Sequence, residues 1–192
     1  MGRNMVKRLM RTTTDRLVFV DNLAVGTHPD TWLDATKDRA GEGFAVYGND
    51  RFLFIEGDAR EVIRALERNT QHFEDSYQFP AGKIHDVFHF AAIVGGRAMI
   101  DGDPMAVALD LAIDAELFYW ACRYQPARLL YPSSSAAYPI DLQTEGNAIR
   151  LKESDIDFKR MGQPDMTYGW SKLTGEFLAK IAASHYGLKV TC

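Results

Sequence analysis

A tyrosine and a lysine four residues apart could exchange a proton with a substrate hydroxyl. Tyr168 and Lys172 stand in the stretch Tyr-Gly-Trp-Ser-Lys, which is typical of the opening of a helix. Side chains four residues apart on a helix meet on one face. A phenol has a reference pKa of about 10, and a fixed ammonium beside it favours the phenolate. The spacing therefore favours an acid–base pair; the alternative is a surface tyrosine packed on a lysine stem.

The helix that carries this pair must also pack against the rest of the chain. Leu173, Phe177 and Ile181 repeat at i, i+4 and i+8. This period predicts a buried apolar stripe, with Tyr168 and Lys172 on another face of the helix.

Small hydroxyl residues follow a short apolar run upstream of this helix. The run Arg128-Leu129-Leu130-Tyr131 leads into Pro132-Ser133-Ser134-Ser135. Parallel α/β sheets place their chemistry at the carboxyl ends of strands, so these serines are candidate functional residues. The alternative is a serine triplet that forms a turn or a helix cap.

Taken together, the strand, the serines and the later Tyr-x-x-x-Lys pattern resemble the extended short-chain dehydrogenase/reductases, specifically the NAD-dependent nucleotide-sugar epimerases and dehydratases. In that family a Ser or Thr four residues before the tyrosine at this strand end is catalytic. That rule selects Ser134, which lies four residues before Tyr138. The resemblance therefore implies a catalytic triad of Ser134, Tyr168 and Lys172, of which Tyr168 and Lys172 would also contact the cofactor.

An acidic residue ends the first apolar strand pattern, residues 17–20. In dinucleotide-binding folds such an acid accepts hydrogen bonds from the adenosine ribose and repels the 2′-phosphate of NADP. Asp21 therefore points to NAD; the alternative is an acid in a plain turn. Asn22 belongs to the wording Val-Asp-Asn-Leu, which resembles the family, and is included in the predicted cofactor site.

Two further strand ends supply cofactor positions by resemblance. After the strand at 51–55, Asp58 would bond the adenine amino group and Ala59 would offer its backbone to the ring, although Asp58 could equally cap the helix at 59–67. After the strand at 85–90, the family passes the pyrophosphate and nicotinamide ribose over the positions of Phe90, Ala91 and Ala92, the last two small enough to let the backbone approach.

Two histidines, His85 and His89, have a spacing that could bind zinc on a helix. The surrounding pattern predicts a strand, so we expect no metal site.

Relatives begin with a strand and the loop Gly-x-x-Gly-x-x-Gly, whose backbone approaches the pyrophosphate. Neither is found here: Gly41-Glu42-Gly43 is followed by Val46 where a third glycine is needed. Gly2 aligns with the third glycine of that loop. The resemblance also implies a sugar-binding lobe beyond Cys192.

We therefore expect an α/β fold with a doubly wound parallel sheet, Rossmann-like, lacking the first strand and the C-terminal substrate lobe. Residues 1–192 would form one partial NAD-binding domain. Within it, the sequence predicts a first helix over 1–10, a weak helix near 30–39, a loop over 73–83 and a long helix over 103–123. The resemblance implies a homodimer through the helices 103–123 and 168–186, and it places Leu111 where the family often has an Asn.

The overall composition excludes several classes of protein. A net charge of −4 and a pI near 5.7 argue against a nucleic-acid binder. The apolar segment 104–122 contains Asp110, Asp114 and Glu116, which argues against a membrane span. Two cysteines give no disulfide framework, which favours the cytoplasm. The basic N-terminus is a candidate transit peptide, but a first helix fits it better.

These observations predict an NAD-dependent epimerase or dehydratase that acts on a nucleotide-diphosphate sugar by transient oxidation of a sugar hydroxyl. Relatives that epimerise next to the resulting ketone carry a Cys where this chain has Ala136. This difference favours a 4-epimerase or a dehydratase-like enzyme. The alternatives are a non-catalytic dinucleotide-binding or scaffold protein on the same fold, and an inactive fragment.

Overall fold

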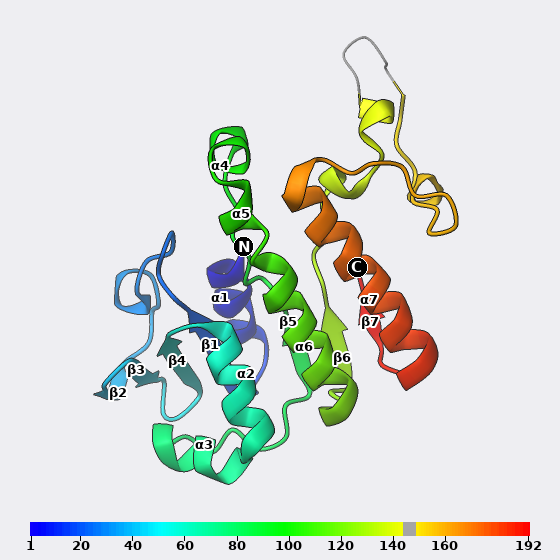
Figure 1. The fold of residues 1–192 in the computed structure, drawn as a ribbon. Coiled ribbons are helices and arrows are strands. Elements are labelled where there is room, and N and C mark those ends of the chain that lie inside the picture. The colour runs from blue at the N-terminus through cyan, green and yellow to red at the C-terminus, as the bar shows by residue number, and fades with distance from the viewer. Residues whose placement is uncertain (144–148) are drawn as a thin grey trace. The chain divides into compact units, whose positions relative to one another are not determined.

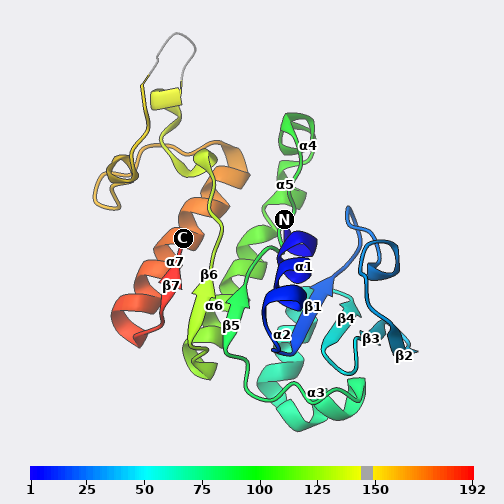
Figure 2. The same ribbon diagram turned by 180° about the vertical axis from the view of Figure 1, so that it is seen from behind.

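The computed structural model describes residues 1–143 and 149–192 (Figures 1 and 2). The chain divides into an N-terminal unit, Met1–Ile84, and a C-terminal unit, His85–Cys192. Each unit has its own sheet and its own helices. The α/β class expected from the sequence is therefore confirmed.

The N-terminal unit contains a four-stranded sheet in the order β1-β4-β3-β2. Strand β1 pairs with β4 in parallel, whereas β3 runs antiparallel to both β4 and β2. Its elements are α1 (Gly2–Thr12), β1 (Leu17–Asp21), η1 (Pro29–Thr31), β2 (Lys37–Gly41), β3 (Phe44–Tyr47), β4 (Phe52–Glu56), α2 (Ala59–Arg68) and α3 (Thr70–Tyr77).

Strand β4 is the centre of this unit because its side chains are buried on both faces of the sheet. Phe52, Leu53 and Phe54 are fully buried. Phe52 and Phe54 form a core cluster with Tyr47 of β3 and Val6 of α1. A continuous apolar run of this kind is typical of a strand covered on both sides.

The C-terminal unit contains a three-stranded parallel sheet in the order β5-β6-β7. Helices α6 and α7 connect the strands and lie side by side on one face of this sheet (Figures 1 and 2). Its elements are β5 (Asp86–Phe88), α4 (Arg97–Gly102), α5 (Pro104–Val107), α6 (Asp110–Tyr124), β6 (Arg128–Leu130), η2 (Ser135–Ala137), η3 (Ile140–Gln143), η4 (Glu153–Asp155), α7 (Met166–Tyr186) and β7 (Val190–Thr191).

Several elements differ from the sequence-based expectation. The weak helix expected near residues 30–39 is wrong: this segment holds η1 and then β2, which forms a hairpin with β3. Gly43 turns the hairpin with a φ of +69°, a conformation that glycine adopts without steric cost. The first sheet is therefore mixed, and only the second is wholly parallel.

Two helical segments also differ. Residues 70–77, part of which the sequence assigned to a loop, form α3. The long helix expected over 103–123 is interrupted after Val107, so that α5 and α6 are separate elements. None of the helices in the described ranges combines the length and apolar character of a bilayer-spanning segment.

Candidate active site

Helix α7 brings Tyr168 and Lys172 together, as their spacing predicts. The Lys172 ammonium lies 5.9 Å from the centre of the Tyr168 ring and 5.0 Å from the centre of the Tyr131 ring. Lys172 is only 4% exposed, so the lysine stem does not lie at the surface. A buried ammonium over aromatic faces is held by cation–π attraction.

The buried face of α7 matches the expected stripe only in part: Leu173 is 4% exposed, as predicted. Phe177 is 44% exposed and packs on the Phe158 ring. Lys172 itself lies on the buried face, together with Gly175, Ala179 and Ala182. Gly175 is needed there because a Cβ would lie 1.9 Å from the Tyr131 hydroxyl oxygen. The buried face of the helix therefore consists largely of small residues, together with Leu173 and Lys172.

Ser134 hydrogen-bonds to the Tyr168 phenol. Ser134 is the N-cap of η2, where its hydroxyl accepts a bond from the Ala136 N–H at 3.3 Å. Helix α7 approaches η2 closely at Gly169, where a Cβ would lie 2.3 Å from the Ala136 carbonyl oxygen. The C-terminal unit thus brings Ser134, Tyr168 and Lys172 together.

The electrostatics of Tyr168 correct one expectation. The pKa of Tyr168 is raised from its ordinary value, first because the phenol is buried, and further because Asp110 and Asp114 lie nearby. The hydrogen bond from Ser134 acts in the opposite direction. The expected lowering of this pKa by Lys172 is therefore not the net result.

A buried polar cluster beside Lys172 escaped the sequence analysis. Asp110 and Asp114, one turn apart on α6, are each 1% exposed. Asp114 bonds His89 Nε2 at 2.8 Å and accepts a bond from the Tyr131 hydroxyl at 2.6 Å. Asp110 accepts a bond from the Ile93 N–H at 2.6 Å. Two acids at i and i+4 in an otherwise apolar helix could have indicated this buried cluster from the sequence.

The predicted cofactor segment Phe90, Ala91 and Ala92 follows β5 and is partly buried. Its two flanking residues, His89 and Ile93, are both bound to carboxylates of α6. The segment is therefore anchored at both ends, although its contact with a cofactor stays a prediction.

Leu111 stands where the resemblance places an Asn in the family. Leu111 is 38% exposed, whereas the preceding residue, Asp110, is buried. The polar position facing the cluster is therefore Asp110.

The described residues contain no group of three or more His, Cys, Asp or Glu that could hold a metal ion.

A second polar contact lies one turn beyond Lys172. The Ser133 hydroxyl donates to the Glu176 carboxylate. Burial raises the pKa of Glu176, while this hydrogen bond lowers it. The spacing of Lys172 and Glu176 at i and i+4 could have identified this acid from the sequence.

In the N-terminal unit, Asp21 ends β1, and its Oδ1 accepts a bond from the Leu23 N–H at 2.9 Å. Asn22 binds the Ala24 N–H at 3.1 Å through its own side chain. Leu23 has a φ of 56°, so the turn is tightly bent. The Asp21 carboxylate is held in place at a strand end and is partly exposed.

Asp58 has the capping role that the sequence left open. It accepts a bond from the Arg60 N–H at 2.8 Å and forms an ion pair with the Arg60 guanidinium at 2.6 Å. These bonds to Arg60 hold its pKa below the ordinary value. Asp58 and Ala59 open α2, and Asp58 lies just beyond the end of β4, whose partner β1 ends at Asp21.

Gly2 begins α1, where a Cβ would lie 3.2 Å from the Phe19 ring of β1. This close approach of helix and strand matches the packing role of the third glycine in the dinucleotide-binding loop.

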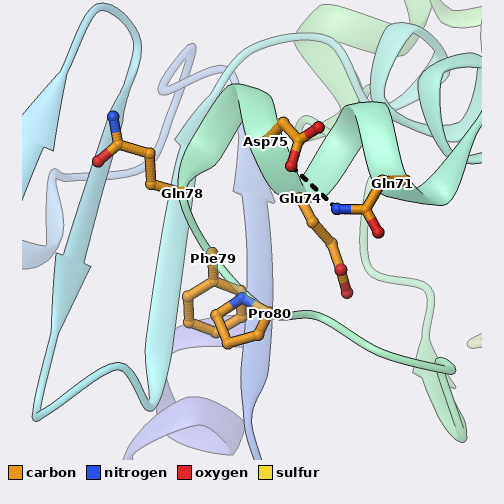
Figure 3. Close-up of a pocket in the computed structure, with 6 residues that line it drawn as sticks. All are labelled: Gln71, Glu74, Asp75, Gln78, Phe79 and Pro80. Carbon is orange, nitrogen blue, oxygen red and sulfur yellow. Dashed lines mark hydrogen bonds between the residues drawn. The ribbon is translucent and has the colours of Figure 1, made fainter.

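A pocket of about 380 Å³ lies in the N-terminal unit, away from these residues (Figure 3). It is formed by α3 and the segment after it, and contains none of the predicted site residues. Its lining residues are Gln71, Glu74, Asp75, Gln78, Phe79 and Pro80.

Comparison with known proteins supplies independent information. The sequence model of the NAD dependent epimerase/dehydratase family matches residues 1–192. No curated protein matches the chain significantly. Among solved structures, UDP-glucose 4-epimerase of Thermus thermophilus, in complex with NAD, is 20% identical with a TM-score of 0.64. The match covers 98% of this chain and 49% of that one.

Two further solved structures have the same relation to the chain. UDP-N-acetylglucosamine 4-epimerase of Methanobrevibacter ruminantium is 19% identical with a TM-score of 0.65, over 98% of this chain and 49% of that chain. The dTDP-glucose 4,6-dehydratase DesIV of Streptomyces venezuelae is 18% identical with a TM-score of 0.63, over 98% and 48%. The chain therefore spans about half the length of these structures, and the likeness concerns the fold.

Proposed function

Because the chain belongs to the NAD dependent epimerase/dehydratase family, we propose that the protein containing it transiently oxidises a nucleotide-diphosphate sugar. Its catalytic residues are Ser134, Tyr168 and Lys172. The observation that carries this proposal is the contact of these three side chains within one unit: the Ser134–Tyr168 hydrogen bond and the Lys172 ammonium beside the Tyr168 ring.

The predicted cofactor is NAD, which would supply the hydride acceptor. The residues present fit this cofactor. Asp21 offers a carboxylate, held by the Leu23 N–H, that can accept bonds from ribose hydroxyls. Lys172 offers an ammonium to the nicotinamide ribose. Asp58 already binds Arg60 through both carboxylate oxygens, so a contact with the adenine amino group requires it to share these bonds.

Tyr168 moves the proton in this scheme. In its phenolate form Tyr168 would accept the proton of the sugar hydroxyl, and Ser134 would donate a bond to the same oxygen. The carbon that carries this oxygen would lose its hydride to bound NAD, which would leave a ketone. The ketone would acidify neighbouring C–H bonds, which permits loss of water or inversion at the adjacent carbon. Return of the hydride to the opposite face of the ketone would instead invert the oxidised carbon itself. The raised pKa of Tyr168 favours the phenol at neutral pH. Turnover limited by the oxidation step should therefore rise with pH through the neutral range.

The substitution Tyr168→Phe tests this function. It removes the proton carrier and keeps the ring that packs beside Lys172. Positioned acid–base groups contribute about 10²- to 10⁴-fold to rates, so turnover of a nucleotide-diphosphate sugar should fall by that factor. NAD binding, measured by calorimetry, should change little.

Ser134→Ala serves as the graded comparison, because it removes one hydrogen bond and no proton carrier. Its loss of turnover should be smaller than that of Tyr168→Phe. Near-normal turnover by Tyr168→Phe contradicts the proposed mechanism.

A further inference from the structure

The two buried carboxylates of α6 have unequal sets of partners. Asp114 is bonded through both oxygens, to His89 and to the Tyr131 hydroxyl. Asp110 uses one oxygen for the Ile93 N–H, while its Oδ2 is buried with no hydrogen-bond partner in the structure. A buried carboxylate oxygen without a donor costs free energy unless a nearby positive charge offsets it.

Lys172 supplies a positive charge that attracts the Asp110 carboxylate. Helix α7 packs directly against α6, and Lys172 is buried on that helix. Tyr131 links the two sides: its hydroxyl donates to Asp114, and its ring lies 5.0 Å from the Lys172 ammonium. The Asp110 carboxylate interacts electrostatically with Lys172 and with Tyr168.

We propose that Asp110 is a positioning residue of the active site: its buried carboxylate balances the charge of Lys172 and anchors the segment after β5 through Ile93. This inference rests on the proposed function for its consequence in catalysis, but the charge effect itself is a property of the folded chain.

The physical reason is competition between charges of opposite sign. Lys172 alone stabilises a phenolate at Tyr168, whereas a carboxylate on α6 destabilises it. Burial weakens the screening by water, so both effects are larger than they would be at the surface. Neutralising Asp110 leaves the charge of Lys172 less compensated and should make Tyr168 more acidic.

Several other ionisable groups of this unit already have bonded partners. Arg97 of α4 pairs with Asp165 at the start of α7. The α5 helix carries no charged residue. His89 after β5, Tyr131 after β6 and Glu176 on α7 each have a hydrogen-bond partner, whereas Cys192 after β7 is exposed.

The test is an ultraviolet difference titration of the Tyr168 phenol. The titration curve of each protein is compared with that of the same protein carrying Tyr168→Phe, which isolates Tyr168 from the other tyrosines. Asp110→Asn is the main variant, because its amide oxygen can still accept the bond from Ile93. The pKa of Tyr168 should be lower in Asp110→Asn than in the unaltered protein.

Asp141→Asn is the matched control, since Asp141 is an exposed acid of the same unit. The pKa of Tyr168 in this variant should equal that in the unaltered protein.

Asp114→Asn is the second variant, used if circular dichroism shows that Asp110→Asn does not fold. The same downward shift of the Tyr168 pKa is expected, because Asp114 also raises that pKa. An unchanged or higher pKa in the folded variant overturns the proposal. The readout needs neither substrate nor NAD, so it is independent of whether the proposed activity is found.

Discussion

At the scale of single residues, the charge state of Tyr168 depends on side chains from three elements. Burial raises its pKa most, Ser134 at the start of η2 lowers it, and Asp110 and Asp114 on α6 raise it further. A Tyr-x-x-x-Lys spacing specifies only Lys172, the partner on the same helix. The chemistry of the pair therefore follows from neighbours that are distant in sequence.

Asp110 should make stability depend on pH. Burial raises its pKa from 3.8 to about 6. The folded protein holds the Asp110 proton more tightly than the unfolded chain does. The contribution of Asp110 to stability is therefore greatest below its unfolded pKa, and it is lost as pH rises through about 4 to 6. Asp110→Asn should therefore raise the free energy of unfolding by about 2–3 kcal/mol near pH 8.

The gain from Asp110→Asn should largely disappear near pH 4, where the carboxyl group is protonated in the folded protein. Urea unfolding at the two pH values measures it. An equal gain at both values would show that ionisation of Asp110 is not the cause.

Asp21 should determine the choice of cofactor in the protein that contains this chain. Its carboxylate can accept bonds from two ribose hydroxyls but repels a 2′-phosphate. NAD should therefore bind more tightly than NADP, and Asp21→Asn should reduce this preference by about tenfold, which corresponds to about 1.4 kcal/mol. Calorimetric titration with both nucleotides measures it.

Asp15→Asn is the control for this titration, because Asp15 is an exposed acid of the same unit. It should leave the preference unchanged. Similar dissociation constants of the unaltered protein for NAD and NADP contradict the role of Asp21.

At the scale of elements, the approach of α7 to η2 sets the distance between Ser134 and Tyr168. Gly169 permits this approach, because any Cβ would lie 2.3 Å from the Ala136 carbonyl oxygen. Gly169→Ala should therefore push the helix away from η2 and destabilise the protein by about 1–3 kcal/mol. It should also reduce turnover, because Tyr168 moves relative to Ser134.

Gly102→Ala is the matched control, since nothing lies within 4 Å of a Cβ at that position. Thermal unfolding and turnover should both be close to those of the unaltered protein. If Gly169→Ala matches this control, the close contact between α7 and η2 is not required.

At the scale of the whole molecule, each unit has a buried core of its own. Phe54 is fully buried in the N-terminal unit, and Leu129 is 1% exposed in the C-terminal unit. Phe54→Leu and Leu129→Val each remove buried contacts, at a cost of about 1 kcal/mol. Hydrogen exchange should accelerate mainly in the unit that carries the substitution, because local opening follows cooperative units.

Mass spectrometry of peptides from both units measures this exchange, and each variant serves as the control for the other. Equal acceleration in both units by either variant would show that the chain opens as a single cooperative unit.

The sequence by itself determined the local features of this protein. Apolar runs and their polar ends predicted the parallel strand pairs and the positions of Asp21, Ser134 and Tyr168, because these patterns depend on neighbouring residues. The α/β class and the family followed from them. The hairpin of β2 and β3 was not predicted, since the segment is polar and rich in glycine and its pairing depends on β4.

Only the tertiary structure decided which face of α7 is buried and which charges surround Lys172. The i, i+4, i+8 pattern predicted that Phe177 is buried, yet Phe177 is 44% exposed. The helix instead packs at Gly175 against Tyr131, whose hydroxyl donates a hydrogen bond to Asp114. Asp110 and Asp114 read as acids that exclude a membrane span, but they are the buried partners of the site. Long-range packing and electrostatics depend on residues that the sequence keeps apart, which is why periodicity could not reveal them.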